Sequence, residues 1–111
     1  MGEQYYRMES INDKLINKYQ VTIYFNMDDD FMSFVPAHRL YINNLIEKNI
    51  IDAYTVSMES QRGWIIMNAA SKKEVEKYLR KSPLYQYWKV EIDELFVYDG
   101  QSYRLPALQL N

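Results

Sequence analysis

The chain has 111 residues, of which 48% are hydrophobic, 15% aromatic and 25% charged, and it contains no cysteine. This length and composition predict one folded domain with one core, and the lack of cysteine excludes disulfide scaffolds, thiolate metal sites and cysteine nucleophiles. The net charge of -2 leaves no basic surplus for a phosphate backbone, so we expect no nucleic-acid partner.

Nothing in the sequence predicts a membrane partner. Its apolar runs are shorter than the roughly 20 residues that span a bilayer, and its first residues lack the apolar stretch of a signal peptide. A cysteine-free chain also fits a reducing compartment, so we expect a cytoplasmic protein. Residues 1–18 are expected to be a leader or a short helix, because apolar residues follow Ser10 at helical spacing.

Alternating side chains predict a strand from Tyr19 to Met27. The three aspartates that follow, from Asp28 to Asp30, are typical of a helix start, where free N–H groups favour negative charge. An EF-hand loop would also begin with acidic residues, but its central glycine and closing glutamate are missing. We therefore expect a helix start and no metal.

A helix is predicted from Phe31 to Asn49, because apolar side chains recur there every three or four residues. Pro36 fits the first turn of a helix best, which makes residues 31–34 a candidate for a separate short turn. Asn49 is suited to the left-handed position that ends many helices.

The next elements are predicted to be a hairpin. A strand from Ile51 to Glu59 places Tyr54, Val56 and Met58 on one face, and a second strand runs from Trp64 to Asn68. Residues 60–63, with Gly63 as the glycine, form the predicted turn between them.

A second helix and a fourth strand complete the pattern. Ser71 and Glu74 have the spacing of a capping box, and the helix that they begin should end before Pro83. A short aromatic connector, residues 84–88, then leads to a strand from Val90 to Tyr98. Residues 99–111 are expected to be a C-terminal tail, ordered only by contact with another part of an assembly.

The resulting order βαββαβ predicts an α+β, ferredoxin-like domain over residues 19–98: a four-stranded antiparallel sheet with two helices on one face. No helix remains to cover the other face, where several predicted side chains are apolar or aromatic. Such a face usually marks an interface. We therefore expect a homodimer that pairs two sheets.

One segment resembles a known family. Residues 82–95, which read SPLYQYWKVEIDEL, are similar to the end of muconolactone isomerases, where a Pro-Leu-aromatic-x-Tyr segment runs into a strand of the Val/Ile-Glu-Ile/Val-Asp-x-Leu type. The preceding elements are similar in length and order, so the resemblance covers about residues 19–98. It implies a dimeric α+β barrel, with higher homo-oligomers possible. It also implies isomerisation of a lactone by proton transfer, without metal or organic cofactor.

The resemblance also directs attention to the first helix. Muconolactone isomerases have a glutamate early in this helix as part of their proposed acid–base apparatus, and an ungapped alignment places His38 at that position. A helix lysine of the family falls near Val35.

His38 is the only histidine, and its ordinary pKa near 6.5 suits proton transfer near neutrality. It shares a helical stripe with Val35 and Ile42, so it should face the sheet. Two interpretations stay open: a catalytic proton carrier, or a partly buried histidine hydrogen-bonded to a tyrosine or serine. A single histidine with scattered carboxylates does not predict a metal site.

Three further residues are candidates for substrate binding. Arg62 beside Trp64 is placed to hold a carboxylate, or is simply a solvated hairpin charge near Glu59. Tyr54 and Trp64 are expected to shape a pocket or to pack in a dimer core. The sequence thus leaves two functions open: a cofactor-free isomerase or lyase acting on a small organic acid or lactone, and a non-catalytic dimeric module that binds a metabolite or a protein.

Overall fold

The computed structural model describes residues 16–99. Its elements, in chain order, are β1 (Asn17–Phe25), α2 (Asp29–Ser33), α3 (Val35–Glu47), β2 (Ile51–Ser57), β3 (Arg62–Ala69), α4 (Lys72–Arg80), the 3-10 turn η1 (Tyr85–Tyr87) and β4 (Trp88–Glu94). The predicted leader, apart from residues 16–18, and the tail beyond Asp99 lie outside the described residues.

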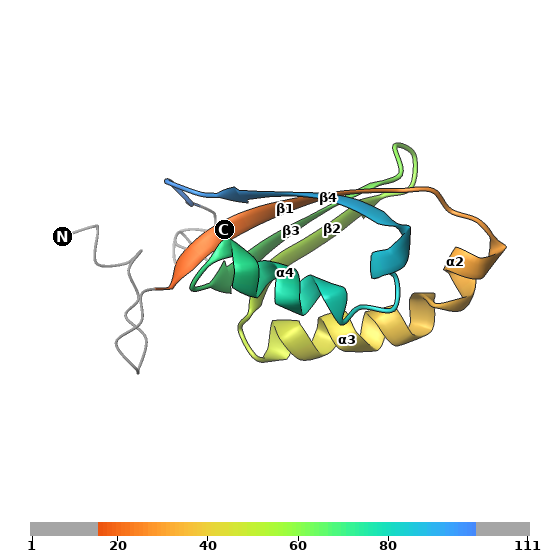
Figure 1. Ribbon diagram of the computed structural model, residues 1–111, viewed down its shortest axis with the longest axis horizontal. Coiled ribbons are helices and arrows are strands. Elements are labelled where there is room, and N and C mark those ends of the chain that lie inside the picture. The colour runs from red at the N-terminus through yellow and green to blue at the C-terminus, as the bar shows by residue number, and fades with distance from the viewer. Residues whose placement is uncertain (1–15, 100–111) are drawn as a thin grey trace, which may run out of the picture.

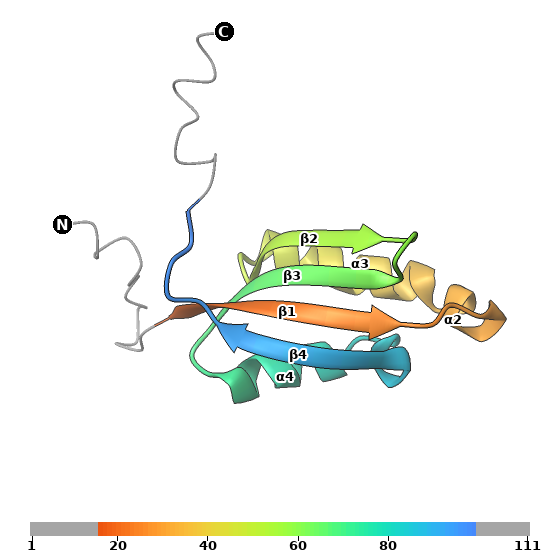
Figure 2. The same cartoon turned by 90° about the horizontal axis from the view of Figure 1, so that it is seen from above.

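The four strands form one antiparallel sheet in the order β2-β3-β1-β4. Figure 1 shows α3 and α4 packed on the same face of this sheet, and Figure 2 shows the strand order from above. This α+β arrangement is compatible with the predicted ferredoxin-like fold. The opposite face of the sheet carries no helix within residues 16–99, as the sequence predicted.

The core follows from the alternation along the two central strands. Every second residue of β1 from Tyr19 onward is buried, and the same period continues along β3 from Gly63 to Ala69. Helix α3 adds His38, Ile42 and Leu45 from one stripe, and α4 adds Val75 and Leu79. The apolar core therefore lies between the sheet and these two helices.

The helix starts predicted from sequence are confirmed by hydrogen bonds. Asp28 precedes α2, and its Oδ1 accepts a bond of 2.8 Å from the backbone N–H of Phe31. The break between α2 and α3 falls before Pro36, which lies in the first turn of α3. Ser71 precedes α4, where its hydroxyl accepts the N–H of Glu74 at 3.2 Å.

Several predicted boundaries are corrected. The first strand begins at Asn17 and ends at Phe25, two residues before the predicted end. The second strand ends at Ser57. The last strand ends at Glu94 rather than Tyr98: its ladder with β1 stops at the pair Tyr19–Glu94, and one further backbone bond follows, from the N–H of Leu95 to the carbonyl of Lys18 at 2.9 Å.

The hairpin turn also differs from the prediction. Gly63 lies inside β3, and the left-handed turn residue is Gln61, with φ of 55°. Asn49, after α3, has φ of 64°, which confirms the left-handed position predicted there.

A β-bulge interrupts β2 near its start. Ile51 pairs with Met67 and Ala53 with Ile66, so Asp52 is an extra residue without a partner in the register. The side chain of Asp52 is held by Lys18 through an ion pair and by the Nδ2 atom of Asn68 at 3.0 Å. Because of this extra residue, both Ile51 and Tyr54 face the helices, although they are three positions apart.

Over residues 16–99, the helices are too short or too polar to cross a membrane.

Candidate functional site: an apolar pocket with a buried histidine

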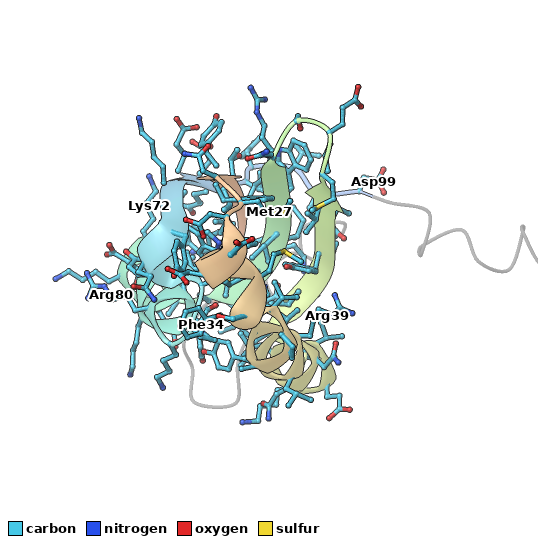
Figure 3. The ribbon with its side chains drawn as sticks, turned by 90° about the vertical axis from the view of Figure 1, so that its right-hand side faces the viewer. Met27, Phe34, Arg39, Lys72, Arg80 and Asp99 are labelled. Atoms are coloured by element: carbon cyan, nitrogen blue, oxygen red, sulfur yellow. The ribbon has the colours of Figure 1, made fainter. Side chains whose placement is uncertain are left out.

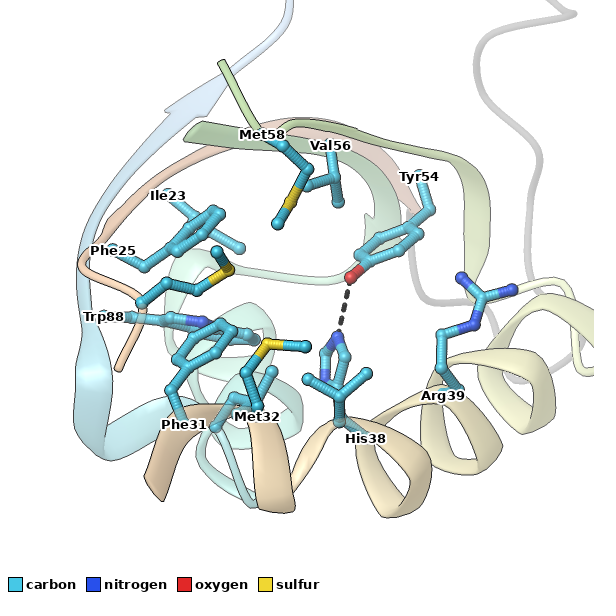
Figure 4. Close-up of a pocket in the computed structure, with 13 residues that line it drawn as sticks. Ile23, Phe25, Phe31, Met32, His38, Arg39, Tyr54, Val56, Met58 and Trp88 are labelled. Atoms are coloured by element: carbon cyan, nitrogen blue, oxygen red, sulfur yellow. Dashed lines mark hydrogen bonds between the residues drawn. The ribbon is translucent and has the colours of Figure 1, made fainter. Parts of the chain in front are cut away.

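A pocket of about 180 Å³ lies between the sheet and helices α2 and α3. Figure 4 shows the side chains around it, which come from β1, α2, α3, β2 and β4. Ten of its thirteen lining residues are apolar: Ile23, Phe25, Met27, Phe31, Met32, Val35, Val56, Met58, Leu84 and Trp88. The other three are His38, Arg39 and Tyr54, which carry most of the pocket's polar side-chain atoms; Trp88 adds an indole N–H.

The aromatic wall of the pocket is built by local and long-range packing. Asp28 fixes the start of α2, which directs Phe31 inward to stack on Phe25 with 5.1 Å between ring centroids. Trp88, the first residue of β4, packs edge-on against the His38 ring at 5.5 Å. The pocket is thus preformed by rings from segments far apart in the chain.

His38 is 2% exposed, and both of its ring nitrogens are hydrogen-bonded to other side chains. Nδ1 lies 2.8 Å from the hydroxyl of Ser82, and Nε2 lies 2.7 Å from the hydroxyl of Tyr54. The sequence left two interpretations of this histidine open. The geometry is that of the second, a buried histidine bonded to a tyrosine and a serine, although the ring also borders the pocket.

Burial sets the charge of this group. It lowers the pKa of His38 to about 4, and the positive charge of Arg39 adds to that effect. Burial also raises the pKa of the Tyr54 hydroxyl, while Arg39 acts in the opposite direction. At neutral pH the pair therefore consists of a neutral imidazole and a neutral phenol. A histidine with a pKa of about 4 is a weak base for proton abstraction near pH 7.

Tyr54 places a hydroxyl among the residues that line the pocket. Its hydroxyl points from β2 toward His38 at the pocket wall, as the dashed line in Figure 4 shows. The predicted strand faces are correct here, because Tyr54, Val56 and Met58 all line the pocket. The direction of the β2 side chains, combined with the bulge at Asp52, brings this hydroxyl to the site.

Arg39 is the site residue that the sequence analysis missed. It follows His38 on α3, is exposed, and lies with its guanidinium carbon 6.0 Å from the centre of the Tyr54 ring. Figure 3, viewed from the α2 end, shows it on the α3 side of the molecule, opposite Lys72 and Arg80. No acidic side chain lines the pocket beside it. The available signal was only its position next to His38, and that signal is weak because neighbours on a helix point in different directions.

The structure does not bring Arg62 and Trp64 to this pocket. Both alternate with buried residues of β3, so they lie on the helix-free face of the sheet. There, the guanidinium of Arg62 lies 5.1 Å from the centre of the Tyr24 ring. Of the predicted binding residues, Tyr54 alone joins His38.

The part of the chain that the structure describes contains no group of three or more histidine, cysteine or acidic side chains placed to hold a metal ion. Comparison of the chain with protein-family models and with curated proteins found no match. The functional argument therefore depends on the geometry of the pocket.

Proposed function

We propose that this protein binds a small, compact organic molecule in the pocket between its sheet and helices α2 and α3. The observation that carries the proposal is a preformed, mostly apolar pocket of about 180 Å³ with one hydroxyl, that of Tyr54, at its wall. Ligand sites typically combine apolar walls with a few placed polar groups in this way. An apolar cavity of roughly 150 Å³ accepts benzene, so a single ring is the expected size of ligand.

The resemblance to muconolactone isomerases extends this proposal to chemistry. A small organic acid or lactone would place its ring among the apolar side chains and its oxygen at Tyr54, with Arg39 beside it to favour an anionic group. In a cofactor-free isomerase or lyase of this kind, Tyr54 would contact the substrate, and His38 would position Tyr54 from behind. Arg39 takes the role that the sequence analysis gave to Arg62.

A non-catalytic binding module is the second candidate, and one observation favours it. Both nitrogens of His38 are engaged by protein hydroxyls, and its pKa is about 4. The group best suited to proton transfer near neutrality is thus unavailable in its resting geometry. Measured turnover of a bound lactone would show that the protein is an enzyme, and binding without turnover would favour the binding module.

The helix-free face supports a further part of the proposal, a homodimer with a ferredoxin-like, dimeric α+β barrel arrangement. Tyr24, Trp64 and Ile66 are partly exposed on this face. A stable pair of sheets would bury about 1,200 to 2,000 Å² there.

The ligand-binding proposal can be tested with benzene and methionine methyl labels. Of the six methionines, Met27, Met32 and Met58 line the pocket, while Met67 is buried elsewhere in the core. Titration with benzene should shift the NMR signals of the three pocket methyl groups and leave that of Met67 in place. Val56→Trp, which adds bulk at the pocket, is the matched control and should abolish the shifts. Unchanged pocket signals in the unmodified protein would refute the proposed function.

A further inference from the structure

A chain of four groups runs from the backbone after α4 to the pocket. The N–H of Leu84 donates to the hydroxyl oxygen of Ser82 at 3.0 Å, and that hydroxyl lies 2.8 Å from Nδ1 of His38. On the other side of the ring, Nε2 lies 2.7 Å from the hydroxyl of Tyr54. Each hydroxyl has one hydrogen to donate, so the position of a single hydrogen decides the direction of the whole chain.

Ser82, at the buried end of this series of hydrogen bonds, fixes their direction. Ser82 is 5% exposed and already accepts the Leu84 N–H. If Nδ1 of His38 also donated to Ser82, the serine hydrogen would have no acceptor among the contacts of its hydroxyl, and a buried unpaired donor is costly. If the serine instead donates to Nδ1, the unpaired hydrogen is that of Tyr54, whose side chain is only partly buried and lines the pocket, where a ligand or water can accept it. The neutral ring then carries its hydrogen on Nε2.

The consequence reaches the pocket through Tyr54. With its hydrogen on Nε2, His38 donates to the hydroxyl oxygen of Tyr54, so the tyrosine hydrogen is left to point at a ligand. In the opposite tautomer, Tyr54 would donate to His38 and offer the ligand only lone pairs. The same three side chains would thus select opposite kinds of ligand in the two tautomers.

We propose that Ser82 and His38 fix Tyr54 as a hydrogen-bond donor, so that the pocket selects compact rings that carry an acceptor atom and no competing donor. The proposal rests on the proposed function, since it assigns the ligand class of the same pocket. His38 is a positioning residue in this scheme, because it acts through Tyr54. At pH 7 its ring is neutral, so one ring nitrogen accepts a hydrogen bond and the other donates one.

The first experiment reads the tautomer directly. Because His38 is the only histidine, ¹⁵N-labelled histidine gives the signals of a single ring. At pH 7, Nε2 should show the shift and proton coupling of a protonated nitrogen, and Nδ1 those of an unprotonated one. Ser82→Ala should reduce the fraction protonated at Nε2. A hydrogen on Nδ1 in the unmodified protein would overturn the proposal, and so would an Nε2 fraction that Ser82→Ala leaves unchanged.

The second experiment compares three rings of similar size: pyridine, which only accepts, pyrrole, which only donates, and benzene, which does neither. Binding is followed at the pocket methionine methyl groups. We expect the ratio of pyridine to pyrrole affinity to fall about 3- to 10-fold in Tyr54→Phe, the range that one net hydrogen bond supplies. Comparing the ratio between two proteins cancels the different hydration of the two probes.

Tyr24→Phe is the matched control, because it removes a hydroxyl from the helix-free face and should leave the ratio unchanged. A ratio that is the same in the unmodified protein and in Tyr54→Phe would overturn the assignment of Tyr54 while benzene binding still supported the pocket. Loss of binding of all three rings in the unmodified protein would refute the proposed function and this inference together. If Tyr54→Phe does not fold, the ¹⁵N measurement on the unmodified protein decides.

Discussion

The hydroxyl of Tyr54 lies 2.7 Å from Nε2 of His38, and this bond joins edge strand β2 to helix α3 across one side of the pocket. The two residues are also in ring contact, with 5.7 Å between centroids. Strand β2 pairs only with β3 in the sheet, so this bond gives the edge strand a second attachment, from its helix-facing side to α3.

The pH dependence of stability should report on His38. Its pKa is about 4 in the folded protein and near 6.5 in the unfolded chain, so the unfolded state binds more protons between these values. The free energy of unfolding should therefore decrease as pH falls from about 6.5 to about 4, by about 2 to 3 kcal/mol from this group. Urea unfolding at several pH values measures this change.

His38→Gln is the variant that isolates this contribution, because glutamine is polar but does not titrate. It should be less stable than the unmodified protein at pH 7 by about 1 to 3 kcal/mol, since Ser82 and Tyr54 lose matched partners. Its stability should also fall less steeply between pH 6.5 and 4. Equal slopes in the two proteins would show that carboxylates alone cause the acid sensitivity.

Tyr54→Phe should lower the free energy of unfolding by about 1 to 3 kcal/mol, because it leaves Nε2 of buried His38 without its partner. The control is again Tyr24→Phe. The Tyr24 hydroxyl lies on the helix-free face at 3.4 Å from Glu91, so its loss should change stability by less than about 0.5 kcal/mol. Thermal or urea melts of both variants give the comparison, and similar losses would show that the His38 bond contributes little.

Asp28→Ala should destabilise α2 and loosen the pocket wall that Phe31 and Met32 provide. Loss of such a cap costs about 0.5 to 2 kcal/mol. Asp28→Ser retains an oxygen that can accept the Phe31 N–H, and it should keep most of the stability. Broadened or shifted Met32 methyl signals in the alanine variant alone would locate the effect at α2; unchanged signals in both variants would argue against it.

The proposed homodimer predicts that a charge in the centre of the helix-free face prevents association. Ile66→Glu should sediment as a monomer at micromolar concentration, whereas the unmodified protein should sediment as a dimer. Leu40, 72% exposed on α3, provides the control, since Leu40→Glu adds the same charge on the helix side and should leave the dimer intact. A monomeric unmodified protein would rule out the proposed pairing.

The elements were predictable because their signals are local. Alternation along β1, the side-chain cap at Asp28 and the position of Pro36 each involve a few neighbouring residues, and all three are seen in the structure. Strand ends were less predictable, because they depend on pairing with residues distant in the chain. The last pair of β4, Glu94 with Tyr19, joins residues more than seventy positions apart in the chain, so no local pattern marks where the ladder stops.

The site was predictable only in part, because it is assembled from distant segments. Periodicity pointed His38 toward the sheet and put Tyr54, Val56 and Met58 on one face of their strand. It could not say which face that was, nor place Arg62 and Trp64, since the face of a strand residue depends on the register of pairing. Ser82 was recognised only as the residue before a proline. Its contact with His38 requires the segment after α4 to return beside α3, which no local pattern in the sequence encodes.

The bulge at Asp52 means that β2 contains one residue more than its pleat requires. A chain shortened by deletion of Asp52 would alternate regularly, with Ile51 and Tyr54 still facing the helices, although the contacts to Lys18 and Asn68 would be lost. Deletion of Thr55 instead would turn Val56 and Met58 away from the pocket. The same loss of one residue thus preserves the binding site at one position of the strand and dismantles it three residues later.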